Sequence, residues 1–323
     1  SEITARYKAR LFQGDSLTDL TGGFGIDCSF LATGFKSATY VERQEELCEI
    51  AAHNFPILNL NHINVRNEDG VAYLQTMSPV DCIFLDPARR NEHGGKTVSI
   101  ADCEPNVAEL EDLLLSKASR IMIKLSPMLD LSLALKELKH TQEVHILSVN
   151  NECKELLILL GQTSPAEITI HCVNLFTKGT QEEQHFVFTR EQEQRSQCTY
   201  TDSLGDYLYE PNASLLKAGA FRSIAAAYPV RKLHPNSHLY TSDTFIENFP
   251  GRIFRIVNQC SFNKKEVKEN LADLKKANVT VRNFPATVAE LRKRLHLTEG
   301  GDTYLFASTL NNGQKVIIRC EKV

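Results

Sequence analysis

Short β-rich runs alternate with longer amphipathic runs up to residue 189, and this alternation constrains the fold more than any other feature. In 42–55, for example, Leu47 and Ile50 lie on one helix face, and further helices are expected at 131–139 and 152–160. Alternation at this rhythm builds βαβ units with parallel strands. We therefore predict an α/β fold with a doubly wound, mostly parallel, seven-stranded sheet. Its expected strands are 16–20, 37–42, 62–67, 82–86, 120–125, 143–149 and 185–189.

The pattern changes after a polar stretch at 189–200, where we place a linker. The sheet domain is predicted to span 1–195, followed by two smaller α+β domains at 203–250 and 251–323. Pro211 is expected in the first turn of a helix, because its ring fixes a helical φ and its missing N–H costs nothing there. Other expected elements are helices at 264–279 and 287–295, and a hairpin of 303–309 and 314–320 with a turn at 311–313.

The composition is that of an ordinary globular chain: 323 residues, 42% hydrophobic and 24% charged. No apolar run approaches the ~18 residues of a membrane span, so no membrane association is expected. The nine cysteines include no C-x-x-C pair, which argues against a disulfide framework or a zinc finger. We therefore expect a cytoplasmic protein with no structural metal. No signal peptide is recognisable, and because the sequence starts at Ser1 without Met, we expect native residues before it.

The net charge of −4 conceals an asymmetry between the two parts of the chain. Residues 1–189 contain 16 Lys and Arg against 26 Asp and Glu, a net charge of −10. Residues 190–323 contain 20 Lys and Arg against 14 Asp and Glu, a net charge of +6. A basic second part favours an anionic partner such as nucleic acid. Surface charge that only maintains solubility is an equal alternative.

A glycine-rich turn, DLTGGFGID, follows the first expected strand at residues 19–27. Glycines there let the backbone pass close to a ligand, while the next helix points its first N–H groups at the same space. A dinucleotide fingerprint would need a further glycine at position 28, which is Cys28. The alternative is a tight turn without a ligand. The candidate cofactor-binding residues of this turn are Asp19, Thr21, Gly22, Gly23 and Gly25.

Acidic residues stand where the second, third and fourth expected strands end. Glu42 ends the second strand, where a carboxylate can accept both hydroxyls of a ribose; it could instead start a helix, where it complements the helix dipole. Asp69 follows the third strand and could receive an adenine amino group, or could cap a helix. Asp86 closes the fourth strand. Parallel strands end at one edge of a sheet, so these residues suit one nucleoside-like ligand.

The fourth strand ends in DPARR, where a buried run emerges into the expected cleft. Proline lacks an N–H and has a fixed φ, so Asp86 and Pro87 form a rigid corner whose carbonyls remain free to accept hydrogen bonds. We predict that these two are catalytic and orient an amine. The predicted substrate-binding residues are Ala88, Arg89, Arg90 and Lys124, the last lying in an apolar strand. The alternatives are salt bridges for the arginines and, for the lysine, a side chain that reaches the surface.

Nearly the whole chain resembles a bacterial family of class I S-adenosylmethionine (SAM)-dependent methyltransferases with a ferredoxin-like piece and a C-terminal THUMP-like domain. Within it, the glycine turn resembles motif I, and Asp86 to Arg89 resembles motif IV, with Ala88 in place of a second proline. The resemblance implies a Rossmann-like catalytic domain and places Tyr7 and Lys8 near the cofactor. It is carried by 1–11, 19–27, 84–90, 122–127, 207–221, 238–243 and 300–306.

The resemblance implies a SAM-dependent methyltransferase (EC 2.1.1.-) that methylates a base in structured RNA, either tRNA or rRNA, because THUMP domains bind RNA. Alternatives are a methyltransferase that acts on a protein or small molecule, a non-catalytic RNA-binding protein with a vestigial pocket, and an NAD-dependent oxidoreductase. RNA would meet the basic second part of the chain. The candidate contacts are Arg231, Lys232, His234, Arg252, Arg255, Lys264, Lys265, Lys275, Lys276, Arg292, Lys293 and Arg294.

Overall fold

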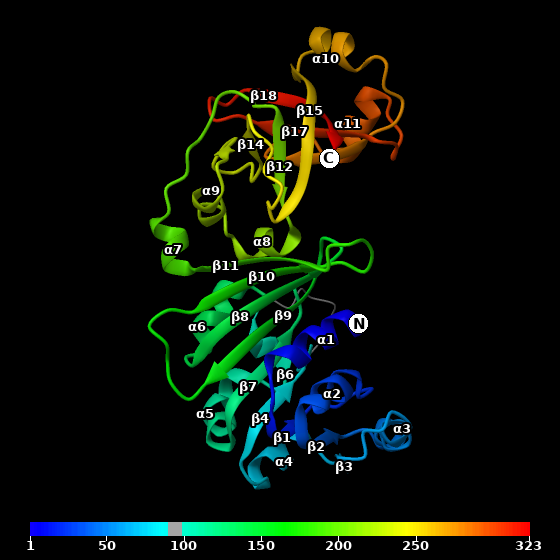
Figure 1. Cartoon of the computed structure of the whole chain (residues 1–323), viewed down its shortest axis with the longest axis vertical. Helices are drawn as coiled ribbons and strands as arrows, with labels where there is room; N and C mark the ends of the chain where they lie inside the picture. Colours follow the sequence, from blue (N-terminus) through cyan, green and yellow to red (C-terminus); the bar gives the residue numbers. More distant parts are fainter. Residues whose placement is uncertain (90–98) are drawn as a thin grey trace. The chain divides into compact units, whose positions relative to one another are not determined.

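The computed structural model describes residues 1–89 and 99–323 and divides into two compact units (Figure 1). The first unit is Ser1–Arg190 and the second is Glu191–Val323. Arg90 lies outside the described residues, as does the side chain of Arg89. None of the described helices is both long and apolar enough to cross a membrane.

A nine-stranded sheet forms the centre of the first unit. Its strands are β1 (Gly14–Asp19), β2 (Phe35–Glu42), β3 (Ile63–Asn67), β4 (Val80–Leu85), β7 (Ala118–Leu125), β8 (Thr141–Val149), β9 (Glu152–Gly161), β10 (Thr169–Leu175) and β11 (Glu183–Thr189). Their order is β11-β10-β8-β9-β7-β4-β1-β2-β3. Five neighbouring pairs are parallel, and β9 and β11 run antiparallel to their neighbours. The predicted mostly parallel α/β fold is thus confirmed.

Helices cover both sides of this sheet (Figure 1). On one side, Tyr7 and Leu31 pack against Leu17 and Phe84 in a buried cluster. Short strands β5 (Ala88–Arg89) and β6 (Cys103–Glu104) pair separately. The helices of this unit are α1 (Glu2–Leu11), α2 (Ile26–Leu31), α3 (Glu45–Ile57), α4 (Gly70–Thr76), α5 (Val107–Lys117) and α6 (Leu131–Glu137), with single 3₁₀ turns η1 (Ala32–Gly34) and η2 (Ile100–Asp102). Helix α7 (Arg190–Arg195) begins at the last residue of the first unit and continues in the second.

Two strands of this sheet were not predicted, so the expected count of seven is wrong. Residues 152–160, predicted as a helix, lie in β9, and β10 was not recognised. The cause is a run of leucines and isoleucine from 156 to 160, which has no polar face and suits a strand buried on both sides. Asn150 and Asn151, both at positive φ, turn the chain directly from β8 into β9.

Strand order reverses at β1, which has β2 on one side and β4 on the other. The register places Asp19 beside Tyr40 of β2 and Phe84 of β4. Asp19, Glu42 and Asp86 therefore lie at the same edge, at or just beyond the strand ends. In open α/β sheets, ligands bind at this switch point.

The second unit contains one seven-stranded sheet in the order β13-β14-β12-β15-β18-β17-β16. Its strands are β12 (Tyr207–Pro211), β13 (Arg231–Lys232), β14 (Tyr240–Ser242), β15 (Gly251–Ser261), β16 (Asn278–Arg282), β17 (Thr303–Thr309) and β18 (Lys315–Lys322). Its helices are α8 (Ala213–Ala218), α9 (Ser223–Ala227), α10 (Lys264–Leu271) and α11 (Val288–Leu295). Because β12 pairs with β15, segments 203–250 and 251–323 share this sheet; their description as separate domains stays a prediction.

The expectation for Pro211 is wrong. It ends β12 instead of lying in the first turn of a helix. The next residue, Asn212, is the N-cap of α8, and its side chain accepts a hydrogen bond from the Leu215 N–H at 3.2 Å. A side-chain acceptor at the N-cap satisfies a helix donor that would otherwise have no partner, so this cap sets the start of the helix.

Candidate active site

The turn after β1 requires glycine at two positions for different reasons. A Cβ on Gly22 would lie 2.3 Å from the ring of Tyr40, which is fully buried. Gly23 has φ of +54°, a left-handed conformation that other residues adopt at a cost. Chain neighbours aside, the Thr21 carbonyl is the only group of the described residues within 4 Å of a Cβ at Gly23, so among them a side chain there would enter open space.

Glu42, at the end of β2, holds this turn in place. Its Oε2 accepts a hydrogen bond from the Gly23 N–H at 2.9 Å, and its Oε1 accepts one from the Gln44 N–H at 2.9 Å. The residue is 9% exposed. Two backbone donors thus orient the carboxylate, and each of its oxygens keeps a lone pair for a ligand hydroxyl.

Asp69 is the N-cap of α4, as the alternative interpretation proposed. Its Oδ1 accepts hydrogen bonds from the Val71 and Ala72 N–H groups, both at 3.0 Å. Both bonds use Oδ1, so capping and a ligand contact through Oδ2 are compatible.

A cavity of about 540 Å³ brings these groups together. That volume is in the range of small-molecule sites. Arg43 and Glu104 form an ion pair of 3.0 Å on its wall, joining the end of β2 to β6. The sequence prediction missed both, because nothing local linked two residues so far apart. The cavity is lined by Leu20, Thr21, Gly23, Glu42, Arg43, Gln44, Asp69, Gly70, Val71, Asp86, Ala88, Glu104, Pro105, Asn106, Glu109 and Leu110.

A second cavity, of about 380 Å³, also borders the Asp86–Ala88 corner. Asp86 and Ala88 line both cavities, and the Asp86 N–H donates to the Thr21 hydroxyl at 2.6 Å. The predicted substrate residue Lys124 lines only the second. Its lining residues are Asp86, Pro87, Ala88, Cys103, Lys124, Leu125, Ser126, Pro127, Leu129, Lys154 and Glu155.

Five charged side chains form a continuous chain of ion pairs beneath this corner. Lys124 binds Asp86 at 2.5 Å and Asp27 at 2.8 Å. Asp27 also binds Lys8 at 3.0 Å, and Lys8 in turn binds Glu155 at 2.8 Å. Acidic and basic groups alternate along the chain, so each lysine is held between two carboxylates. Asp27, at the start of α2, was not predicted as a site residue, although it lies within the glycine-rich turn at 19–27.

Burial and these ion pairs shift the pKa values in opposite directions. Burial raises the pKa of Asp86 above its ordinary value, and the neighbouring Lys124 only partly counteracts this. Burial alone would lower the pKa of Lys124, but Asp86 and Asp27 raise it above its ordinary value. For Asp27, Lys8 and Lys124 outweigh burial and lower the pKa. Asp86 is thus the group in this chain best suited to exchange a proton.

Asp19 lies beneath the cavity and is not among its lining residues. It is 1% exposed, and its Oδ1 accepts the Thr21 N–H at 3.0 Å. Burial raises the pKa of Asp19 to about 7; the Thr21 hydrogen bond lowers it, and nearby Asp27 and Asp86 raise it further. Asp19 therefore shapes the turn from below.

The remaining predicted cofactor residues lie away from the larger cavity. Gly25, with φ of +73°, is the N-cap of α2, where a Cβ would lie 2.9 Å from the ring of Phe55. Tyr7 packs against the sheet in the buried cluster, and its hydroxyl lies 2.8 Å from Nδ1 of His145. Lys8 is 1% exposed within the ion-pair chain. Neither Tyr7 nor Lys8 lines either of the two cavities.

The fold and the site match a solved structure over the whole chain. A "putative methyltransferase" from Porphyromonas gingivalis W83 is 38% identical, with a TM-score of 0.91; the match covers 100% of this chain and 81% of that one. This chain belongs to the same methyltransferase family. The family is that of class I SAM-dependent methyltransferases with ferredoxin-like and THUMP-like parts. In this methyltransferase, residues 207–250 match a ferredoxin-like domain model and residues 251–322 a THUMP domain-like model.

More distant solved structures resemble parts of the methyltransferase. A structure from Listeria monocytogenes described as a "putative class I S-adenosylmethionine-dependent methyltransferase" has 12% identity and a TM-score of 0.41, covering 54% of this chain and 65% of that one. An rRNA methylase from Streptococcus thermophilus has 13% identity and a TM-score of 0.36, and the match covers 50% of this chain and 93% of that one. No curated protein matches the sequence.

Proposed function

We propose that this methyltransferase transfers the methyl group of SAM to a base nitrogen in structured RNA. One observation carries the proposal: the Asp86–Ala88 corner forms a shared wall of two cavities. The larger cavity suits the cofactor and the smaller one an acceptor group. Transfer between two ligands needs this arrangement, because most of the rate comes from holding the reacting atoms close and aligned.

The larger cavity has the groups that a nucleoside-like cofactor requires. Glu42 would accept the ribose hydroxyls, and Asp69 would accept an adenine amino group through Oδ2. Gly23 leaves open the space that a Cβ would occupy. When bound, SAM supplies a methyl group already activated by its sulfonium. The chain's own residues then need only bind, orient and manage one proton.

Asp86 manages that proton in the proposed mechanism. An amine loses a proton when it gains a methyl group, and the Asp86 carboxylate takes it. A raised pKa makes this carboxylate a stronger base. Lys124, 2.5 Å from this carboxylate, would hold it in place, and both residues line the second cavity. Ala88 lines both cavities, and Pro87 fixes the corner that presents Asp86.

RNA is proposed as the substrate because exposed cations remain on two helices of the second unit. Helices α10 and α11 pack into one apolar cluster, through Leu271 and Leu295 respectively. Their exposed basic side chains are Lys264, Lys265, Lys268, Lys293 and Arg294. Cations on neighbouring helices can meet phosphates of one RNA.

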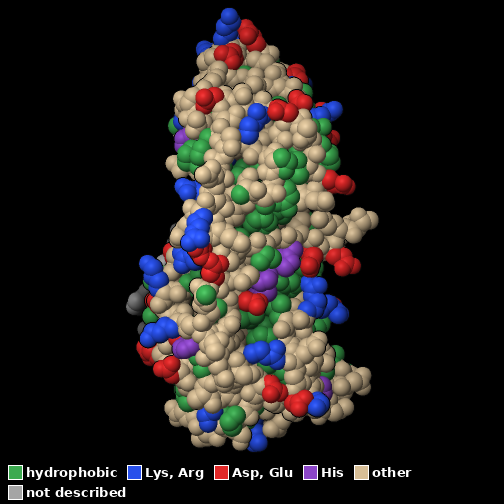
Figure 2. Space-filling model, turned by 60° about the vertical axis from the view of Figure 1, so that its left-hand side comes forward, with side chains coloured by type: hydrophobic (Ala, Val, Ile, Leu, Met, Phe, Trp, Pro, Cys, Tyr) green, Lys and Arg blue, Asp and Glu red, His purple; other side chains and the backbone are tan. Residues whose placement is uncertain are grey.

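Several other predicted RNA contacts have protein partners. Lys232 is 2% exposed, and burial lowers its pKa to about 8. Arg231, Arg252 and Arg255 form ion pairs with Asp243, Glu210 and Glu321. On the face in Figure 2, Lys and Arg side chains are interspersed with Asp and Glu and form no continuous patch. The proposed RNA contact therefore comprises α10, α11 and the exposed Lys275 and Lys276, which follow α10.

The first test measures cofactor binding by calorimetric titration with SAM. Glu42→Ala should weaken binding roughly 10- to 150-fold, the loss of charge-assisted hydrogen bonds worth about 1.5–3 kcal/mol. Glu45→Ala, at the exposed start of α3, is the matched control and should bind as the wild type does. Equal affinities for the wild type and E42A would remove Glu42 from the cofactor site.

The second test identifies the acceptor. RNA from a strain that lacks the gene is incubated with the protein and methyl-labelled SAM, and nucleosides are resolved by mass spectrometry. We expect label in one nucleoside. Asp86→Asn should abolish transfer while leaving SAM affinity within about tenfold. Asp112→Asn, exposed on α5, should be fully active. Label in the protein fraction with none in RNA would refute the RNA substrate but not methyl transfer.

A further inference from the structure

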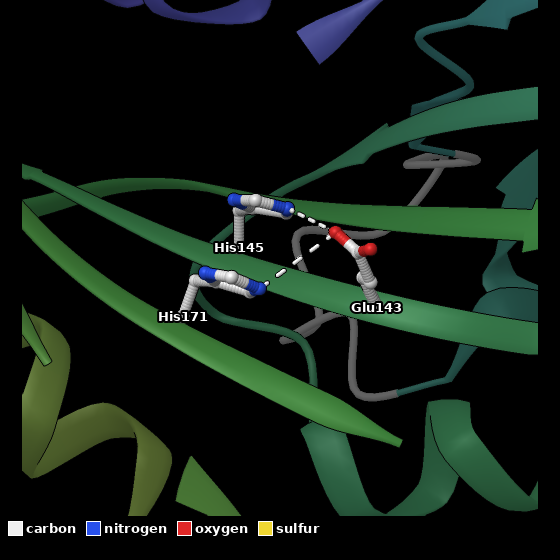
Figure 3. A group of neighbouring side chains, drawn as sticks. All are labelled: Glu143, His145 and His171. Carbon is white, nitrogen blue, oxygen red and sulfur yellow. Dashed lines mark hydrogen bonds and ion pairs between the residues drawn. The ribbon is translucent and has the colours of Figure 1, made fainter. Parts of the chain in front are cut away.

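Three side chains from two neighbouring strands converge on one face of the large sheet (Figure 3). Glu143 and His145 lie two residues apart on β8, so both point to the same face. His171 lies on β10, where the register places it directly beside His145. The two imidazole rings stack, with centroids 4.3 Å apart and planes 6° from parallel.

The three side chains direct one ligand atom each to a common point. Glu143 Oε2 lies 3.2 Å from Nε2 of His145 and 3.7 Å from Nε2 of His171. Three such atoms, one per residue, lie within 4.8 Å of one another. Around tetrahedral Zn²⁺, ligand bonds of about 2.1 Å place neighbouring ligand atoms roughly 3.4 Å apart. Two of these separations already match, so small side-chain rotations complete the geometry.

Partners on the far sides of both rings hold the histidines in this orientation. His145 Nδ1 lies 2.8 Å from the Tyr7 hydroxyl on α1. His171 Nδ1 lies 3.1 Å from Nε2 of His185 on β11. With both Nδ1 atoms engaged, both Nε2 atoms face Glu143. Metal-ligating histidines are commonly fixed in this way by a hydrogen bond from the other ring nitrogen.

We propose that Glu143, His145 and His171 bind one divalent transition-metal ion, with Zn²⁺ preferred. Two imidazoles and one carboxylate are ligands that Zn²⁺ accepts readily, and three protein ligands leave a fourth position for water. The side chain of His145 is buried, whereas that of Glu143 is 46% exposed, so an ion can enter from the Glu143 side. None of the three residues lines the cavities at the active site.

The test titrates the chelator-treated full chain with Co²⁺ and then Zn²⁺. We expect one ion per chain, and a cobalt spectrum of nitrogen and oxygen ligands without thiolate charge-transfer bands. Glu143→Gln and His171→Gln should each weaken binding by at least about tenfold. His53→Gln, exposed on α3, is the matched control and should bind like the wild type.

A thermal-shift measurement separates lost affinity from misfolding. Without metal, E143Q should unfold cooperatively, as the wild type does; Zn²⁺ should then raise the unfolding temperature of the wild type and H53Q but not that of E143Q. The absence of stoichiometric binding would overturn the proposal. Equal affinities in E143Q and the wild type would overturn it too. Thiolate bands would also overturn it, because they would show that the ion binds at one or more of the chain's nine cysteines instead.

Discussion

The buried carboxyl of Asp19 should make the stability of the first unit depend on pH. Its ordinary pKa of 3.8 rises to about 7 in the folded chain because of burial. Between these values the folded state holds a proton that the unfolded state has released. Stability therefore falls as pH rises through this window, and the gap of about three units corresponds to about 4 kcal/mol.

Asp19→Asn removes the ionisation and keeps an acceptor for the Thr21 N–H. The difference in unfolding free energy between D19N and the wild type should therefore change by about 4 kcal/mol between pH 4 and pH 8, in favour of D19N at high pH. Comparing the two proteins at each pH cancels other titrations that they share. Asp15→Asn, on the exposed part of β1, is the matched control and should keep the wild-type pH dependence.

The assay is urea unfolding in which hydrogen exchange of the β1 peptide, resolved by mass spectrometry, reports on the first unit alone. This choice matters because the chain has two compact units, and a whole-chain signal need not follow a two-state transition. A D19N difference that stays constant from pH 4 to pH 8 would refute the reasoning, since Asp19 would then ionise in the fold as it does in water.

Three further changes test the site. Gly22→Ala should cost about 1–3 kcal/mol of stability, since its Cβ would lie 2.3 Å from the buried Tyr40 ring. Gly23→Ala has room for its Cβ but strains a φ of +54°, so it should cost about 1–2 kcal/mol; it should in addition weaken SAM binding, which calorimetry on the folded variant measures. Lys124→Met leaves Asp86 without its ion-pair partner and Asp27 paired with Lys8 alone, and should cost roughly 2–3 kcal/mol in urea unfolding, less than a fully buried pair because a fifth of the Lys124 side chain is exposed. Methyl-transfer rates should fall as pH drops through the raised pKa of Asp86, and in K124M this acid limb should move to higher pH; an unmoved limb would show that another group controls it.

Local sequence was sufficient to place six of the 16 residues that line the larger cavity. Strand ends are marked by where an apolar run stops, and parallel strands stop at one edge, so Glu42, Asp69 and Asp86 could be grouped without coordinates. The glycine turn was equally readable, because its conformation depends on a few adjacent residues. The structure brings these groups to one cavity, and their roles remain the proposal above.

Local sequence was misleading where a segment's environment decided its structure. The leucine-rich run in β9 is compatible with a buried helix or a buried strand, and only its neighbours β7 and β8 select the strand. Pro211 suits a first helical turn, yet pairing of β12 with β15 and the Asn212 cap place it at a strand end.

What the sequence determined by itself is the α/β class, the glycine turn and the acidic residues at the strand ends, because each follows from periodicity or from adjacent residues. The tertiary structure alone decided which charges meet. Lys8 reaches Glu155, 147 residues away, and Tyr7 reaches His145 across 138. The cluster of Glu143, His145 and His171 likewise depends on the register of two strands. Such contacts arise only when the sheet closes and brings distant segments within a few ångströms, so no local pattern records them.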